Sequence, residues 1–340
     1  MTEIHTSEHY NGITGACLPE HAMNWTPTDN MLNPDLAHNI QASMEAAGLW
    51  FDTHIADLRD HGFEPGLQDK AGLCQVRSDT GWHFGNVSER YNAFQQSDIA
   101  RVFQPVMDAH KGSKVMRIFS DDLNKPGLTN WMQLDLGSTF EPVPGREIMN
   151  TLMVRWGHGG MASVWAFWCG QDVTCTNMLA QLLASAKGHT LEFKLKHQKN
   201  LDSVISHALT QSGLIARDGV KAMSESLQAI GSFYYTEKQM QDFVRATYPV
   251  SGDHAFDDVA KWRNVVESIQ GGQGHQSFGM AGTGFQLLSG VSEYEQYSSG
   301  GSRSGGCSVS AANSRWKSVQ NGPGQKAIRR AYQHVSALAA

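Results

Sequence analysis

The stretch LMVRWGHGGMASVWAFWCG, residues 152–170, contains two apolar runs joined by the segment Gly157-His158-Gly159-Gly160. Apolar runs separated by a glycine-rich turn are typical of a β-hairpin, because glycine adopts the positive φ angles that tight turns require. The stretch therefore predicts two paired strands. Further along, the chain continues as QDVTCTNML, and we expect a helix that begins near Asn177.

Other strands are expected before and after this hairpin. Apolar and β-branched runs between turn formers predict strands at 73–78, 82–88, 114–119, 130–136 and 147–156. The segment HTLEFKLKHQK, residues 189–199, alternates apolar with charged side chains, which is the period of a half-buried strand. Its charged face is basic.

Helices are expected at both ends of the chain. Asn33 as N-cap and Pro34 at the first helical position predict one kinked helix or two up to Gly62, and Ser97 is expected to cap a helix that runs to about His110. In the second half, helices are predicted at 201–217, 219–230, 236–247, 256–269, 284–296 and 324–338. The helix at 236–247 begins with the capping box formed by Thr236 and Gln239.

These elements predict an α+β fold, an antiparallel or mixed sheet with helices packed mainly on one side and a basic C-terminal helix. We divide the chain into an acidic N-terminal arm with helices, residues 1–70, and a main domain, residues 71–340. The main domain has a strand-rich part at 71–200 and a helical part at 201–340.

The net charge of −6 is unevenly distributed. Residues 1–70 contain eleven acidic residues and two basic ones, whereas residues 296–340 contain six basic residues and no acidic one. A basic end can bind nucleic acid or an acidic partner, but it can equally dock on the acidic segment of its own or a neighbouring copy.

Five cysteines are widely spread without a Cys-x-x-Cys pair, and we interpret them as reduced thiols. The chain has neither a long apolar stretch nor the features of a signal peptide, so we expect a cytoplasmic protein that does not bind membranes.

Four short segments resemble the family catalogued as domain of unknown function 932, the phage/plasmid-like proteins. They occur in the family's order and are GNVSERYNAFQQSD, GHGGMASVWAFWCGQDVTCTNML, GTGFQLLSGVSEYEQY and RWKSVQNGPGQKAIRRA. The resemblance covers most of residues 75–335 and implies a phage or plasmid context, but no reaction. Asp172 stands where many relatives would have an arginine, so a phosphate bound there in relatives would need another residue here.

Enzyme signatures are mostly absent from the sequence. There is no phosphate loop, no Gly-x-Ser-x-Gly elbow and no His-Glu-x-x-His motif, and we expect neither a cofactor nor a metal ion. The glycine-rich segment 271–284 precedes a helix and is either an anion site or a flexible connector. His158 is interpreted as a hydrogen-bonded turn residue rather than a metal ligand, and Cys175 as a packing residue rather than a nucleophile.

The stronger functional candidates are basic and aromatic residues. Cations and stacking rings together hold single-stranded nucleic acid in many proteins. The candidate cations on or beside the basic strand are Lys187, Lys194, Lys196, His197 and Lys199, and those near the C-terminus are Arg315, Lys317, Lys326, Arg329 and Arg330. The candidate stacking rings are Trp82, Tyr91, Trp156 and Trp316. The alternative is that the lysines form a solvated face and the rings belong to the core.

The segment Ser88-Glu89-Arg90-Tyr91 follows a predicted strand, where alternation would place Ser88 and Arg90 on one face. Arg90 is expected either to bind a phosphate or to form a buried ion pair with an acid such as Glu293. The ion pair is the interpretation that we favour.

The first functional hypothesis is a non-enzymatic protein of a phage or plasmid that binds single-stranded DNA in replication or recombination, as an annealing or protective homo-oligomer. The second is a protein that binds a host protein or evades host defence through acidic residues near Asp52, Asp57 and Asp60. The third is an enzyme that uses the glycine-rich segment with His158 or Cys175.

Overall fold

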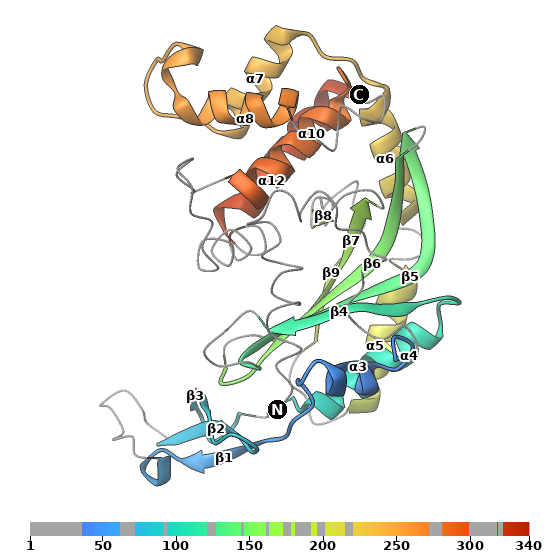
Figure 1. The fold of residues 1–340 in the computed structure, drawn as a ribbon, viewed down its shortest axis with the longest axis vertical. Coiled ribbons are helices and arrows are strands. Elements are labelled where there is room, and N and C mark those ends of the chain that lie inside the picture. The colour runs from blue at the N-terminus through green and yellow to red at the C-terminus, as the bar shows by residue number, and fades with distance from the viewer. Residues whose placement is uncertain are drawn as a thin grey trace.

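The computed structural model of the chain describes residues 36–61, 72–91, 94–120, 127–143, 146–160, 163–172, 178–180, 192–195, 201–214, 220–271, 281–298, 318 and 322–339. In Figure 1 a small sheet lies at one end of the molecule, a larger sheet in the middle and a group of helices at the other end. The described strands pair antiparallel throughout, so the predicted α+β class is confirmed.

The small sheet contains three strands, β1 (Thr53–Asp57), β2 (Leu73–Arg77) and β3 (His83–Val87), in the order β1-β2-β3. The strands predicted at 73–78 and 82–88 are therefore confirmed. The prediction of helix up to Gly62 is wrong for its second half, because residues 53–57 pair with β2 instead.

Helix α3 (Ile40–Ala46) is the helical part of that segment. Its N-cap is Asn39, whose side chain accepts a hydrogen bond from the Ala42 amide at 2.9 Å. Asn33, the N-cap expected from the sequence, lies outside the described residues. The helix ends before Gly48, whose φ of +65° suits a glycine and turns the chain toward β1. In residues 53–61, pairing with a distant strand is thus more favourable than the helix that the local sequence predicts.

The larger sheet is built on the predicted central hairpin. Its strands are β4 (Lys114–Ser120), β5 (Thr129–Val143), β6 (Arg146–Gly157), β7 (Val164–Asp172), β8 (Met178–Ala180) and β9 (Glu192–Leu195). The order is β4-β5-β6-β7, and both β8 and β9 pair with β7 along the same strand. The helix expected near Asn177 is wrong from Met178 onward, because residues 178–180 complete hydrogen bonds at this edge of β7.

Alternation along β5 and β6 gives the larger sheet two different faces. Met132, Leu134 and Leu136 point to one face, where they are at most 4% exposed, together with Leu152 and Val154 of β6. These residues belong to one hydrophobic core with Ile40 and Met44 of α3 and with the buried side of helix α4 (Gln96–Asp108). We call this side of the sheet the apolar face. The division of the chain at residue 70 stays a prediction.

Helix α4 begins at Gln96, so Ser97, the expected N-cap, lies inside the helix. Its N-cap is Gln95, whose backbone amide donates to the Asp98 carboxylate at 3.0 Å. The Gln95 side chain instead contacts β1, where its oxygen accepts a hydrogen bond from the Thr53 amide at 2.9 Å. One glutamine therefore fastens the start of α4 to the edge of the small sheet.

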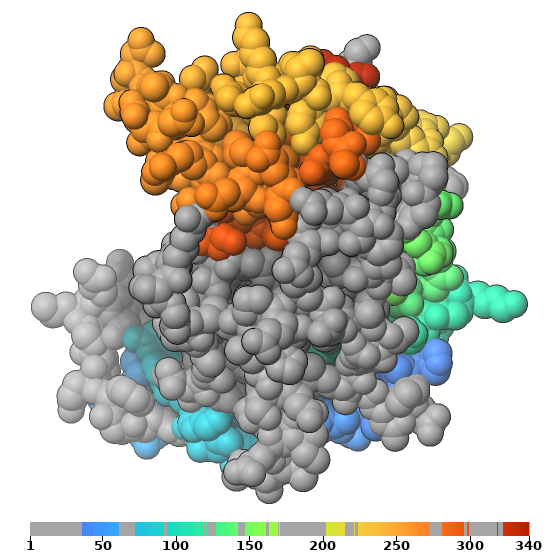
Figure 2. Space-filling view, turned by 45° about the horizontal axis from the view of Figure 1, so that its top comes forward, coloured from blue at the N-terminus to red at the C-terminus, as the bar shows by residue number. Residues whose placement is uncertain are grey.

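The other helices follow the predicted order. They are α5 (Leu201–Leu214), α6 (Val220–Ser232), α7 (Glu237–Thr247), α8 (Ala260–Gly271), α10 (Gly284–Glu293) and α12 (Pro323–Ala339). The capping box of α7 is confirmed, since the Thr236 amide donates to the Gln239 side chain at 2.8 Å. Helices α7, α8, α10 and α12 lie together at the end of the molecule opposite the small sheet (Figures 1 and 2). Within the described residues no helix is both long and apolar enough to cross a membrane.

Helix α10 is buried on all sides from Gly284 to Ser292. At Gly284 a side chain would lie 2.8 Å from the Ile230 carbonyl oxygen of α6, and at Gly290 it would lie 2.6 Å from the Ile269 Cα of α8. Both glycines therefore serve close packing of helices. A turn of π-helix, Tyr294–Ser298, continues α10 at its C-terminal end.

A buried glutamine joins the two sheets. Gln75 of β2 is fully buried, and its amide nitrogen donates to the Thr53 hydroxyl at 2.7 Å and to His158 Nδ1 at 3.1 Å. Its carbonyl oxygen accepts from the Gly159 amide at 2.6 Å. The His158 ring stacks on Phe84 with 5.3 Å between ring centroids. The turn role predicted for His158 is confirmed, and the β6–β7 turn is thereby anchored on the small sheet.

Gly159 and Gly160 offer a matched test of this junction. Both have positive φ, but a Cβ at Gly159 would lie 2.6 Å from the Phe84 carbonyl oxygen, whereas a Cβ at Gly160 meets nothing within 4 Å. We expect Gly160→Ala to cost about 1 kcal/mol from backbone strain alone. Gly159→Ala should cost about 1–3 kcal/mol more because the backbones must separate. Urea unfolding of both variants measures the difference, and equal losses would contradict the close approach.

Candidate nucleic-acid interface

The second face of the larger sheet carries charged and aromatic side chains. We call it the polar–aromatic face. Its described members come from four adjacent strands and are Arg117, Trp131, Gln133, Met153, Arg155, Trp165 and Phe167. The cross-strand pairs Arg117–Gln133, Trp131–Arg155 and Arg155–Trp165 place them on one side, because directly opposed residues of antiparallel strands point the same way.

In one row of this face, residues of adjacent strands lie directly opposite one another. Trp131 of β5 lies opposite Arg155 of β6, Arg155 lies opposite Trp165 of β7, and Trp165 lies opposite Lys194 of β9. The Arg155 guanidinium carbon is 5.3 Å from the centre of the Trp131 ring, a cation–π contact. The predicted basic strand is thus joined to two tryptophans and an arginine in a single hydrogen-bonded register.

The rings of this face also pack on one another. The centroids of Trp165 and Phe167 are 4.6 Å apart, and Phe167 meets Trp131 edge-on at 6.3 Å. Trp131 and Phe167 are each 1% exposed and Trp165 is 7% exposed, whereas Arg117 and Arg155 are half-buried. Removing guanidinium groups from water costs free energy that apolar residues would not cost. Both side chains keep their positive charge when half-buried, so this face carries cations as well as rings.

Asp135 adds a carboxylate to the same side of β5. It is 9% exposed and accepts a hydrogen bond from the Gly137 amide at 2.8 Å. Burial raises the pKa of Asp135, and the Gly137 amide and the charge of Lys114 oppose the rise. An anionic ligand on this face would therefore meet a carboxylate that protonates at a higher pH than an exposed aspartate does.

Trp156, a candidate stacking residue, lies on the apolar face. It is 1% exposed and its indole nitrogen donates to the Gln96 side chain at 2.7 Å. This placement favours the alternative of a core aromatic. Buried tryptophans usually find such an acceptor for the indole N–H.

Strand β3 ends at Val87, so the alternation expected for residues 88–91 does not apply. These residues form a turn in which the Tyr91 amide donates to the Ser88 carbonyl at 2.9 Å, and the Tyr91 hydroxyl accepts from the Gly160 amide at 3.4 Å. Arg90 is exposed, and Glu293 lies on α10 among the helices at the other end of the molecule. The expected Arg90–Glu293 ion pair is not formed among the described residues.

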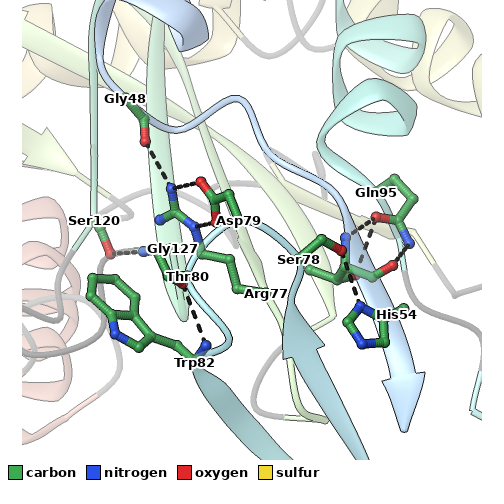
Figure 3. Close-up of polar contacts among 11 residues, drawn as sticks. Gly48, His54, Arg77, Ser78, Asp79, Thr80, Trp82, Gln95, Ser120 and Gly127 are labelled. Atoms are coloured by element: carbon green, nitrogen blue, oxygen red, sulfur yellow. Dashed lines mark hydrogen bonds and ion pairs between the residues drawn. The ribbon is translucent and has the colours of Figure 1, made fainter. Parts of the chain in front are cut away.

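Trp82, another candidate ring, lies beside a buried arginine of the small sheet. Figure 3 shows the Arg77 guanidinium bound by both oxygens of Asp79, at 2.6 and 2.9 Å, and facing the Gly48 carbonyl. The guanidinium carbon is 3.9 Å from the Phe51 ring centre and 5.5 Å from that of Trp82. The half-buried Trp82 ring is therefore part of an intramolecular cation–π cluster.

Three of the C-terminal cations lie on α12, where Lys326 is exposed and Arg329 and Arg330 are half-buried. The remaining candidates fall outside the described residues: Lys187, Lys196, His197, Lys199, Arg315, Trp316, Lys317 and also Cys175. For Lys194 the structure gives the backbone register and not the side chain.

The start of α10 does not offer the anion site considered for the segment 271–284. The Gly284 amide donates to the Phe233 carbonyl at 2.7 Å, and the Gly282 amide donates to the Gln286 side chain at 2.7 Å. Thr283 and Gly284 are buried, so these N–H groups do not face solvent. Residues 272–280 lie outside the described part of the chain.

Arg117 and Arg155 were missed by the sequence analysis. Part of the signal was present, because WMQLDL at 131–136 alternates tryptophan, glutamine and aspartate with apolar residues, and Arg155 is the one charged residue of LMVRW at 152–156. Within the described residues no group of three histidine, cysteine or acidic side chains is arranged to hold a metal ion.

The model of the family described as "Domain of unknown function (DUF932)" matches residues 83–320. No curated protein and no solved structure matches the chain.

The Arg77–Asp79 pair predicts a dependence of stability on pH. Hydrogen bonds from Arg77 hold the pKa of Asp79 below its ordinary value of about 3.9. The pair therefore stabilises the protein above that pH, and the contribution is lost as the pH falls through the lowered folded-state pKa. We expect Asp79→Asn to lower the urea midpoint at about pH 7 and to lower it less at about pH 3, where part of the contribution has been lost. An equal loss at both pH values would contradict this role.

Proposed function

Because the chain belongs to the DUF932 family, whose function is unknown, we propose its function from geometry: it binds single-stranded nucleic acid, and specifically single-stranded DNA. The protein acts without catalysing a reaction, as an annealing or protective protein in replication or recombination. The setting is a phage or plasmid within its host cell.

The row formed by Trp131, Arg155, Trp165 and Lys194 is the observation that supports this proposal. Sheets that bind single strands present aromatic rings to the bases and cations to the backbone. Each stacked base contributes about 1–3 kcal/mol, so two indoles and an arginine are enough to hold a short segment.

The row favours a single strand over a duplex. In a duplex the faces of the bases are stacked on their neighbours, so flat rings on a sheet have no base face to contact. A single strand can turn its bases toward the sheet while its phosphates follow the cations. Preference for the unpaired strand is therefore part of the proposal.

Burial of the rings has a consequence for the binding reaction. Trp131 and Trp165 are 1% and 7% exposed, so a base reaches them only when the rings become accessible. A strand then binds a minor state of the protein, and the observed affinity is lowered by the fraction of molecules in that state. We expect association to be slower than simple electrostatic encounter.

A homo-oligomer is part of the same proposal. The acidic N-terminal residues and the basic C-terminal residues of the sequence can attract one another between copies. Annealing and protective proteins cover long strands of nucleic acid. Several copies bound along one strand can do this even when each copy binds it weakly.

A second candidate function is binding of a host protein. Asp52, Asp57 and Asp60 are exposed along β1 and the turn that follows, and Ile55 between them is 39% exposed. An apolar residue among carboxylates on an edge strand suits a partner with a basic surface. Replacing these aspartates with asparagine should leave DNA binding unchanged and weaken such a complex.

Arg155→Gln tests the proposed function. We expect it to weaken binding of a labelled single-stranded oligonucleotide, because it removes both a cation and the centre of the row, by about 1–3 kcal/mol or roughly 5–150-fold in Kd. Fluorescence anisotropy at two salt concentrations measures the change, and a duplex of the same length serves as the competing ligand.

Arg101→Gln is the matched control, because Arg101 is an exposed arginine on α4, away from the polar–aromatic face. Its affinity should stay close to that of the wild type. If wild-type protein binds neither strand nor duplex at low salt, the proposed function is wrong. Equal losses in the two variants would show that net charge, and not the row, governs binding.

A further inference from the structure

Strand β1 is the outer strand of the small sheet, whose order is β1-β2-β3 (Figure 1). Two hydrogen bonds show which of its backbone groups face β2. The Ser78 amide donates to the Asp52 carbonyl at 2.9 Å, and the Leu58 amide donates to the Gly72 carbonyl at 2.8 Å. Hydrogen-bonded residues alternate along an antiparallel pair, and β1 keeps its register with β2 throughout. The N–H and C=O groups of residues 53, 55 and 57 therefore point away from β2.

A side chain of the protein already binds this outward edge at its first position. The Gln95 side chain accepts from the Thr53 amide at 2.9 Å and donates to the Thr53 carbonyl at 3.1 Å. One amide group, drawn beside β1 in Figure 3, thus pairs with both backbone groups as a neighbouring strand would. The next outward groups belong to Ile55, and they have no hydrogen-bond partner among the residues that the structure describes. The edge therefore binds an amide at one position and presents the next positions to a ligand.

The side chains along this edge are exposed and mostly acidic. Ile55 is 39% exposed. Its exposed charged neighbours are Asp52, Asp57, Arg59 and Asp60, so residues 52–60 carry three acidic residues and one basic one, a net charge of −2. Ile55 and Asp57 point to the same face, because alternate residues of a strand do so. An added strand would place one side chain opposite Ile55 and another, two residues away, opposite Asp57.

We infer that the outward edge of β1 binds an extended, basic segment of a partner protein by strand addition. We call this site the β1 edge. In this mode main-chain hydrogen bonds supply affinity, and the side chains opposite the edge supply specificity. An apolar residue suits the position opposite Ile55, and a lysine or arginine suits the position opposite Asp57. A second copy of β1 is a poorer ligand, because it would bring the same acidic residues close to one another.

The inference is independent of DNA binding and rests on the second candidate function, for which it names the mode of contact. It is tested with a peptide with blocked ends, Lys-Thr-Lys-Thr-Val-Thr. In antiparallel pairing its second lysine lies opposite Asp57 and its valine opposite Ile55. NMR titration of the full chain, with isoleucine carrying the NMR-active nitrogen isotope, observes the Ile55 amide, and Ile55→Val identifies that signal. We expect the signal to shift as the peptide binds and its hydrogen exchange to slow.

Two N-methylated forms of the peptide separate backbone pairing from attraction between charges. Methyl groups on the nitrogens of the second lysine and the valine block the N–H groups that face β1. Methyl groups on the first two threonines block N–H groups that face solvent, so this form is the matched control. We expect the first form to bind more weakly than the control form by roughly 5–150-fold in Kd, because two hydrogen bonds are lost.

Asp57→Asn tests the contribution of charge. Asparagine keeps an oxygen that can accept from the Arg59 amide, as Asp57 does at 2.9 Å. We expect this variant to bind the unmodified peptide up to about fivefold more weakly, since it loses one cross-strand charge pair. The matched control is Asp253→Asn, because Asp253 is an exposed aspartate between α7 and α8. Its affinity for the peptide should stay close to that of the wild type.

Equal affinity for the two methylated forms would overturn strand addition, and binding by both would leave attraction between side-chain charges as the mode of contact. An Ile55 amide signal that does not shift, or equal losses in Asp57→Asn and Asp253→Asn, would overturn the site itself. The effect of Arg155→Gln on oligonucleotide binding has no bearing on these results. Failure of the DNA-binding proposal and failure of the β1 edge are therefore distinguishable.

Discussion

The pairing register of β6 with β7 is the constraint on which both faces of the larger sheet depend. Arg155 lies opposite Trp165, and Val154 lies opposite Ala166 one step along. A slip of one residue would exchange the two faces of a strand, because side chains alternate. The same ladder of hydrogen bonds therefore builds the core on one side and the row of rings and cations on the other.

Much of the fold was predictable because its strongest signals are local. The central hairpin, the capping box of Thr236 and the order of the later helices follow from periodicity and turn chemistry within short windows. The errors occur where a distant strand competes for the backbone. Residues 53–57 and 178–180 have few intrinsic strand signals, and they become strands because β2 and β7 present open edges to them.

The candidate interface was only partly predictable. The basic strand with Lys194 was recognised from its period of two, but that period does not tell which neighbouring residues share its face. Trp156 and Arg155 are adjacent in sequence and point to opposite faces, so the choice between them requires the register of the whole sheet. Arg90 was placed on a strand that ends three residues earlier, at Val87. Pairings between distant segments, rather than composition, decide these assignments.

The contact between Glu295 and Gly324 joins two of the segments by which the family was recognised. The carboxylate fills the space that any side chain at residue 324 would need. A Cβ at residue 324 would lie 3.0 Å from this carboxylate and 3.0 Å from the Ser318 hydroxyl, so both side chains would have to shift to admit it. The start of α12 is therefore coupled to the hydrogen bond between Tyr248 and Glu295, because a displaced carboxylate would no longer accept it in the same geometry.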